Sequence, residues 1–392
     1  MKVLHLTDDM SMMGGVQRYL STLETILPDA GVDCVVWAPE AGLLGGAVSR
    51  WYGRRHRGQL QELIDRHAPD VVHAHNLWMR LSPIPLGAAA AAGVPVVMTV
   101  HDYAWVCPRK WMITGDDRPC ETGYSGSCAV SDCRGSHEGR RWLAYNALRW
   151  LKIGWHRRML VRLVDRFVSP SRHLGRWMER SLGVRGVTHI PNFAEAPLVG
   201  PAGPVERPST LLFAGRLGRE KGVDVLIRAM PEVLSHHPEA RLVVAGDGPE
   251  RPALERSASE LGMGREVAFV GALGPEALGR CFAESGLVVL PTLWMENCPV
   301  SVLEAFAHGR AVVATRIGGV PELVEDGTTG ALVDRGDKAD LAERLSGLLA
   351  DPQWIVEMGS NAADAWAKSY TPERHGRSLR MLYQALVEEG MV

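Results

Sequence analysis

Apolar residues of the chain fall mainly into short, nearly continuous runs that alternate with segments of helical length. Such runs are typical of strands buried on both faces of a parallel sheet, because polar and apolar residues do not alternate there. They predict strands at Val3–Thr7, Cys34–Trp37, Val71–His73, Val96–Val100, Leu211–Ala214, Leu242–Ala245, Val267–Val270, Leu287–Leu290 and Ala311–Ala314. Strands that alternate with helices through short connections predict parallel sheets with helices on both faces.

A proline-rich stretch separates these strands into two series. Its members are Pro191, Pro197, Pro201, Pro204 and Pro208, and such a cluster is typical of a connection between domains. The 392 residues also exceed what one ordinary core accommodates. We therefore expect an α/β protein with two doubly wound, Rossmann-like domains facing across a cleft, over residues 1–195 and 205–370. Their ligands should bind outside the carboxyl ends of the strands.

Charge and cysteine content narrow the class of protein. The formal net charge, 43 − 45 = −2, excludes binding of polyanions through the overall charge.

The first residues, MKVLHLTDDM, do not read as a signal peptide. The most apolar stretch, residues 86–100, is too short to span a bilayer and predicts a helix followed by a strand. Seven cysteines without an export signal favour reduced thiols. We expect a cytoplasmic protein that touches a membrane only from its surface.

Two glycine-bearing turns follow predicted strands. Gly14 and Gly15 come after the first strand, where glycine lets the backbone approach a ligand and a helix N-terminus favours an anion. An ordinary turn is the alternative, and the absence of GxGxxG argues against a dinucleotide fingerprint. The run from Gly215 to Gly222 places Arg216 and Lys221 at the end of a second-half strand. Both cations suit a diphosphate, although a solvated basic turn would look the same.

Two glutamates eight residues apart flank a predicted helix start. Pro299 fits the first helical position and Gly309 fits the stop. Glu296 then lies in the preceding loop, and Glu304 lies between one and two turns into the helix. The helix N-terminus between them can hold an anion. The alternative is that Glu296 and Glu304 are two unrelated surface glutamates that form no common site.

Four ordered motifs together resemble the family-4 retaining glycosyltransferases of GT-B architecture. The segment from Glu296 to Glu304 is similar to their E-x7-E motif, and Gly215-Arg216 with Lys221-Gly222 is similar to their diphosphate loop. Residues 244–249, VAGDGP, resemble their G-x-G-P segment. His101 after the strand at 96–100 resembles their active-site histidine. The resemblance spans nearly the whole chain, and it implies that the terminal helix, 371–392, returns to the N-terminal domain. One departure is Phe193, where the family usually has glycine.

The resemblance also implies roles for individual residues. The catalytic set would be His101, Arg216, Lys221 and Glu296, in which the two cations hold the donor diphosphate and stabilise charge on the leaving group. Glu304 would bind ribose hydroxyls, and Glu296 would contact the donor sugar. The donor-binding set would comprise Gly14, Gly15, Gly246, Gly248, Leu273, Asn297, Pro299, Val300 and Glu304.

The implied reaction is transfer of a hexose-type sugar with retained anomeric configuration and no cofactor required for catalysis. The donor would be a nucleotide-diphosphate sugar and the acceptor a saccharide or a lipid-linked molecule, in cell-surface polysaccharide or glycolipid synthesis. An alternative with the same architecture is a nucleotide-sugar epimerase. A non-enzymatic, metal-containing nucleic-acid-binding protein is a third reading, but it leaves the two sheets and their loop motifs without a purpose, so we expect no nucleic-acid partner.

A cysteine-rich insertion at 103–138 interrupts the strand rhythm. Cys107, Cys120, Cys128 and Cys133 favour a structural Zn²⁺ site with four thiolates. No CxxC pair is present, so a redox-labile disulfide or unpaired thiols remain open.

The segment that follows, 140–180, is strongly basic. It contains 11 Lys and Arg residues, with Asp165 and Glu179 as its only acids. It also contains Trp142, Trp150, Trp155 and Trp177, and a basic helix with aromatic and apolar residues favours an anionic membrane surface. We expect peripheral contact at the inner face of the membrane, although an ordinary amphipathic helix with a basic polar face is the alternative.

Overall fold

The computed structural model describes residues 1–8, 10, 15–39, 49–77, 81–114, 118–129, 140–198 and 207–390. It divides the chain into two compact units. Unit 1 comprises Met1–Pro191 and Pro372–Val392, and unit 2 comprises Asn192–Thr371. The chain therefore passes from unit 1 to unit 2 after Pro191, four residues before the expected boundary at 195. The C-terminal segment belongs to unit 1.

Unit 1 contains a parallel sheet of six strands. The strands are β1 (Lys2–Thr7), β2 (Asp33–Trp37), β3 (Val71–His75), β4 (Val96–Thr99), β5 (Arg166–Ser169) and β6 (Thr188–His189). The helices are α1 (Gly15–Asp29), α2 (Ser49–His67), α3 (Leu86–Ala91), η1 (Tyr103–Trp105), η2 (Gly126–Ala129), α4 (Arg140–Leu163), α5 (Arg172–Leu182) and α12 (Pro372–Gly390).

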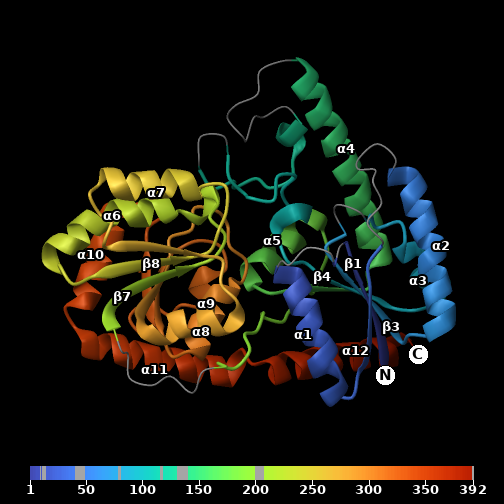
Figure 1. Ribbon diagram of the computed structural model, residues 1–392. Helices are drawn as coiled ribbons and strands as arrows, with labels where there is room; N and C mark the ends of the chain where they lie inside the picture. Colours follow the sequence, from blue (N-terminus) through green and yellow to red (C-terminus); the bar gives the residue numbers. More distant parts are fainter. Residues whose placement is uncertain are drawn as a thin grey trace. The chain divides into compact units, whose positions relative to one another are not determined.

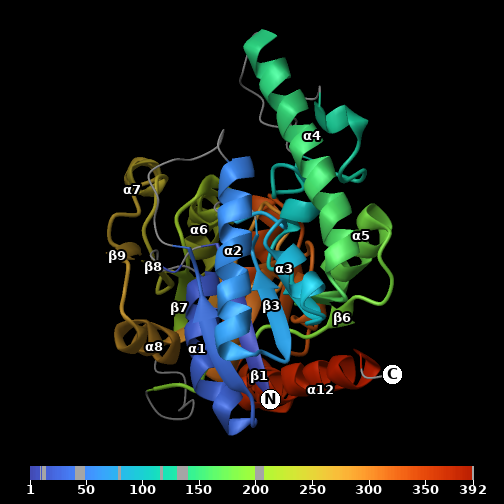
Figure 2. The ribbon, with the colours of Figure 1, turned by 90° about the vertical axis from the view of Figure 1, so that its right-hand side faces the viewer.

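The strand order of unit 1 is β2-β1-β3-β4-β5-β6. The chain therefore changes direction across the sheet between β1 and β3, and ligands of such sheets bind at this switch. Right-handed crossovers place α1 on one face and α2 to α5 on the other. The terminal helix α12 packs beside α1 (Figure 2).

Unit 2 contains a second parallel sheet of six strands. Its strands are β7 (Arg207–Ala214), β8 (Arg241–Ala245), β9 (Val267–Gly271), β10 (Ser285–Leu290), β11 (Ala311–Thr315) and β12 (Gly330–Val333). Its helices are η3 (Arg219–Lys221), α6 (Val223–His236), α7 (Arg251–Glu260), α8 (Pro275–Glu284), α9 (Val300–Ala307), η4 (Val320–Glu322), α10 (Lys338–Leu349) and α11 (Pro352–Ser369).

The strand order of unit 2 is β12-β11-β10-β7-β8-β9, with the switch between β7 and β10. The two faces of the sheet bury separate apolar cores. One core packs under α6, α7 and α10, and the other packs under α8, α9 and part of α11 (Figure 1). Near-continuous burial of the strands on both faces explains their unbroken apolar runs.

The expected class, two doubly wound parallel sheets covered by helices, is confirmed. Three strands escaped the sequence pattern, because each has a weak signal: β5 reads RFVS, β6 has two residues, and β12 begins at Gly330. The strand β5 also divides the basic segment 140–180 into α4 and α5. The basic segment therefore contains two helices with a strand between them.

Candidate functional site

Two loops of unit 2 meet at the switch between β7 and β10. Lys221 lies at the end of η3 in the loop after β7, and Glu296 lies in the loop after β10. The Lys221 Nζ atom is 2.7 Å from Glu296 Oε1, and the two side chains are only 19% and 9% exposed. A largely desolvated ion pair thus occupies the edge of the sheet where doubly wound proteins bind ligands.

Neighbouring side chains hold the Glu296 carboxylate in place. Trp294 donates its indole N–H to Glu296 Oε1 at 2.6 Å, and the Thr292 hydroxyl donates at 3.2 Å. The Lys221 ammonium also lies 4.8 Å from the centre of the Trp294 ring. One carboxylate oxygen therefore accepts three hydrogen bonds, which fixes its direction.

Glycines let the backbone of these loops approach closely. Gly222 has φ +67°, and a Cβ there would lie 2.0 Å from the Pro291 carbonyl oxygen. Gly318, with φ +60°, would bring a Cβ within 2.1 Å of the Glu296 carbonyl oxygen. The next amide, Gly319 N–H, donates to that same oxygen at 2.9 Å. Only glycine fits these positions without displacing the loop that carries Glu296.

Arg216 also lies in the loop after β7, and its guanidinium pairs with Glu220 in the structure. The Arg216 side chain is 57% exposed, so it can exchange this carboxylate for another anion. Gly246 and Gly248 support the loop from the neighbouring β8 end. A Cβ would lie 1.8 Å from the Gly215 oxygen in the first case and 2.4 Å from the Leu217 oxygen in the second.

The second predicted glutamate, Glu304, lies in α9 and is half-buried. The helix begins at Val300, and Pro299 is its N-cap rather than its first helical residue, with φ −66° and ψ 120°. Asn297 is buried beside Glu296. Cys298 lies between them and the helix, and burial raises its pKa to about 12, so it is a protonated thiol at neutral pH.

The other residues predicted to bind the donor do not belong to the loops after β7 and β10. Leu273, after β9, is partly buried against the core under α8 and α9. Gly15 is the exposed first residue of α1 in unit 1. Gly14 lies outside the described residues.

His101 follows β4 in unit 1 and is half-buried. Its Nε2 is 3.0 Å from the Nδ1 atom of His75, the last residue of β3. The Tyr19 and His101 rings pack edge to face, with ring centres 5.0 Å apart. Burial lowers the pKa of His101 to about 4, so the imidazole is neutral at pH 7.

The predicted cysteine site is only partly described. Cys107 is buried, whereas Cys120 and Cys128 are half-buried, and all three are reduced. Cys133 lies outside the described residues. Burial raises the pKa of the Cys107 thiol, and the nearby Cys120 and Cys128 raise it further. The zinc site therefore stays a prediction.

Several residues of the site escaped sequence reasoning. Trp294, Thr292 and Gly318 contact or support Glu296, but none belongs to the four motifs. Trp294 carried a local signal, because it lies two residues before the loop glutamate and a tryptophan N–H usually has a hydrogen-bond acceptor when it is buried. Gly318 carried none, since the close contact that requires glycine comes from a loop more than twenty residues away in sequence.

Two family models match the chain, one in each half of the sequence. A model described as Glycosyltransferase Family 4 matches residues 13–196, and one described as Glycosyl transferases group 1 matches residues 208–351. Alpha-D-kanosaminyltransferase of Streptomyces kanamyceticus is 34% identical over 176 residues, which is 45% of each chain. A GDP-mannose-dependent alpha-(1-6)-phosphatidylinositol monomannoside mannosyltransferase of Mycolicibacterium smegmatis is 38% identical over 41% of this chain and 44% of its own length. The chain thus aligns with under half the length of these relatives.

The fold of the whole chain also has solved counterparts. Anabaena HepE in complex with UDP has a TM-score of 0.70 and 18% identity, over 98% of this chain and 100% of its own. At this identity the likeness shows the fold alone. The two family models together with this fold show that the chain belongs to the family-4 glycosyltransferases of GT-B architecture.

Proposed function

We propose that the protein is a retaining glycosyltransferase that moves a hexose-type sugar from a nucleotide-diphosphate sugar to a saccharide or lipid-linked acceptor. The observation that carries the proposal is the desolvated Lys221–Glu296 pair at the β7–β10 switch, with Arg216 on the same loop. Cations on that edge suit the diphosphate of a donor, and a carboxylate beside them suits hydroxyls of its sugar.

The proposed chemistry is a front-face displacement. The bond between the anomeric carbon and the donor phosphate breaks while the acceptor oxygen bonds to the same face of that carbon. The departing phosphate oxygen accepts the acceptor's proton. Lys221 and Arg216 stabilise the charge that develops on the diphosphate, so the reaction needs no metal. Glu296 orients the donor sugar, Glu304 binds the ribose, and His101 contacts the sugar from unit 1.

The relatives support the substrate classes. HepE was solved with UDP, and the mycobacterial relative is named for GDP-mannose and a phosphatidylinositol mannoside. A sugar nucleotide as donor and a lipid-linked glycan as acceptor are therefore the classes we propose for this chain, in cell-surface polysaccharide or glycolipid synthesis.

One helix of unit 1 suits a membrane-borne acceptor. Leu148, Leu151, Trp155, Arg158 and Arg162 follow a 3-4-3-4 spacing and form one exposed stripe, here called the α4 face. Leu148 is 67% exposed, Leu151 58% and Trp155 46%. The helix contains no acidic residue and extends beyond α2 and α3 of its unit (Figures 1 and 2). Among the described residues no helix is both long and apolar enough to cross a bilayer.

A cavity of about 430 Å³ adjoins the α4 face, and Arg157, Arg158 and Arg162 belong to its lining. Arg157 is buried, and its guanidinium bonds to the carbonyl oxygens of Trp105 and Ser181 and stacks on the Tyr124 ring, with no carboxylate partner in the part of the chain that the structure describes. Its charge therefore remains available to an anion in the cavity. We propose that the α4 face rests on an anionic bilayer at the inner side of the membrane and that this cavity receives a lipid phosphate.

Nucleotide binding tests the proposed site. Thermal-shift measurements with UDP, GDP and ADP should show stabilisation by one of them, about 2.7 kcal/mol at 100-fold over Kd. Lys221→Ala should lose this stabilisation, and Lys368→Ala, which removes an exposed lysine of the same unit, should keep it. Binding by none of the three nucleotides contradicts the proposed donor site.

The reaction itself is tested with sugars on the nucleotide that binds. Proton NMR of the product should show the same anomeric configuration as the donor. An inverted product rejects the retaining mechanism. A changed sugar that appears on the nucleotide without any acceptor identifies an epimerase instead.

A further inference from the structure

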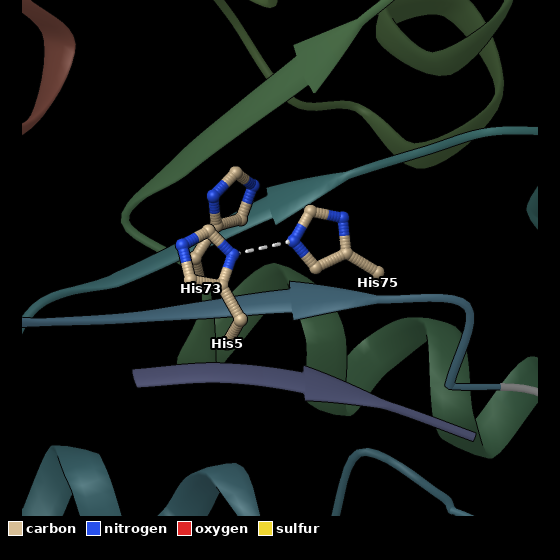
Figure 3. A group of neighbouring side chains, drawn as sticks. All are labelled: His5, His73 and His75. Atoms are coloured by element: carbon tan, nitrogen blue, oxygen red, sulfur yellow. Dashed lines mark hydrogen bonds between the residues drawn. The ribbon is translucent and has the colours of Figure 1, made fainter. Parts of the chain in front are cut away.

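A group of buried histidines lies beneath His101 in unit 1. His5 on β1 and His73 on β3 are paired in register, and His75 lies two residues further along β3 on the same face. All three side chains are fully buried. Figure 3 shows the three rings gathered above the two strands, with His5 hydrogen-bonded to His75. This is the switch point of the unit 1 sheet.

Hydrogen bonds join three of the rings into a line that ends at His101. His5 Nδ1 lies 3.0 Å from His75 Nε2, and His75 Nδ1 lies 3.0 Å from His101 Nε2. A neutral imidazole has one N–H and one lone pair. Each ring must therefore donate in one direction and accept from the other, so all protons of the line point the same way.

The inner end of the line decides that direction. His5 Nε2 is buried and has no hydrogen-bond partner among the described residues. If the protons pointed inward, this atom would carry a buried N–H without an acceptor, which folded proteins rarely contain. If the protons point outward, His5 Nε2 carries only a lone pair without a donor, which costs less free energy than a buried N–H without an acceptor. The outward direction places the proton of His101 on Nδ1.

Resting on the function proposed above, we infer that His5 and His75 form a relay that fixes His101 as the Nδ1–H tautomer, so that it meets the donor sugar as a neutral hydrogen-bond donor. His5 and His75 are positioning residues in this scheme, because neither reaches the substrate. The neighbouring Tyr19 ring is fixed too. His375 Nδ1 donates to the Pro191 carbonyl at 2.8 Å, so its Nε2 accepts from the Tyr19 hydroxyl at 2.8 Å.

The same histidines could instead hold a divalent metal ion, since nitrogen atoms of His5, His73 and His75 lie within 4.8 Å of one another. The contacts favour the relay. Both His73 nitrogens already bond, to Tyr383 at 2.6 Å and to Thr99 at 2.7 Å. Both His75 nitrogens bond as well, so a metal would break hydrogen bonds of two rings, and no carboxylate of the described residues belongs to the group.

The first test reads the tautomers directly. The full chain is labelled with ¹⁵N in its histidine rings, and the signals of His5, His75 and His101 are assigned by removing one histidine at a time. We expect all three to be protonated at Nδ1 and neutral at pH 7.5. A proton on Nε2 of His75 or His101 overturns the relay. So does one equivalent of zinc that the unmodified chain binds and His73→Phe does not, since zinc held by the predicted cysteine site would stay bound in that variant.

The second test compares two replacements of His5. In His5→Asn the side-chain amide can still donate to His75 Nε2, whereas His5→Phe removes the donor. We expect His101 to keep its tautomer and its turnover in His5→Asn. In His5→Phe we expect mixed tautomers and turnover about 10- to 100-fold lower, by analogy with the loss caused by removing the outer-shell groups that orient metal-bound histidines. Equal losses in both variants overturn the inference.

These readouts separate the inference from the proposed function. The tautomers are observed without any substrate, so absence of glycosyl transfer rejects the proposed function and leaves the relay standing. Both His5 variants should bind the nucleotide as the unmodified chain does, because Lys221 and Arg216 lie in the other unit. Thermal melting shows whether each variant is folded.

Discussion

Glu296 illustrates how much of this site depends on single contacts. Its carboxylate accepts hydrogen bonds from Lys221, Trp294 and Thr292, and its carbonyl oxygen lies against Gly318. A carboxylate so restrained needs little reorganisation when a polar ligand arrives. At the residue scale the site is therefore a set of preorganised charges supported by glycines.

Replacing Lys221 by alanine should lower turnover by about 10²–10³, the scale of losing one preorganised charge-stabilising group. Glu296 would also lose its buried counter-ion. Steady-state kinetics with the matching nucleotide sugar measure the effect, and Lys368→Ala is the control. A turnover within a factor of three of the unmodified protein would contradict the role of Lys221.

Gly318→Ala should destabilise unit 2, because a Cβ at φ +60° would collide with the Glu296 carbonyl oxygen. We expect a loss of about 1–3 kcal/mol in the free energy of unfolding. Gly347→Ala is a matched control in α10, where a Cβ meets nothing within 4 Å, and it should stabilise by up to about 1 kcal/mol. Urea unfolding measures both. Equal effects would show that the close contact does not matter.

At the scale of elements, α4 differs from the other helices of unit 1. Its inner side is anchored by buried Ile153, Arg157 and Leu160, while the α4 face exposes large apolar side chains. An anionic bilayer would bury the apolar residues of the α4 face and attract its two arginines. The surface of a water-soluble partner would gain little from a stripe that ends in unshielded cations.

Changing Leu148 and Leu151 together to serine should reduce partitioning onto vesicles with anionic lipid at least about 10-fold, since each leucine loses more than 1 kcal/mol of burial. Changing Arg158 and Arg162 to serine should remove about 1 kcal/mol per cation. The control is Val356→Ser with Met381→Ser, two exposed apolar residues on α11 and α12. Sedimentation with vesicles measures the binding of each variant. If the unmodified chain binds neutral and anionic vesicles equally, the proposed attraction between the arginines and anionic lipid is contradicted.

At the scale of the molecule, the buried histidines make stability depend on pH. Burial lowers the pKa of His5 from 6.5 to about 3, and it lowers that of His73, His75 and His375 as well. Below pH 6.5 the unfolded chain binds protons that the folded chain does not. The stabilisation is therefore complete above pH 6.5 and is lost as the pH falls toward the folded values.

For His5 alone this linkage amounts to about 2 kcal/mol at pH 5, which is 1.5 pH units below the unfolded pKa. His5→Asn should therefore reduce the loss of unfolding free energy between pH 7.5 and pH 5 by about that amount. Urea unfolding at the two pH values measures it. An unchanged pH dependence in His5→Asn would show that His5 is protonated in the folded protein.

Local sequence determined the parts of this protein that depend on neighbours in the chain. Apolar runs specified most strands, because burial on both faces of a parallel sheet leaves no polar positions. The resemblance of four motifs indicated the family, and the family models bear it out. Weak or very short runs such as β6 and β12 could not be predicted, since neighbouring strands rather than their own residues hold them in place.

Only the tertiary structure decided which distant side chains meet. Strand order brings Lys221 to Glu296 across 75 residues and His5 to His75 across 70. No local pattern encodes such pairs, because each is created when parallel strands align and their carboxyl ends share one edge. For the same reason Gly318 looked like an ordinary loop glycine until the fold placed the Glu296 carbonyl against it.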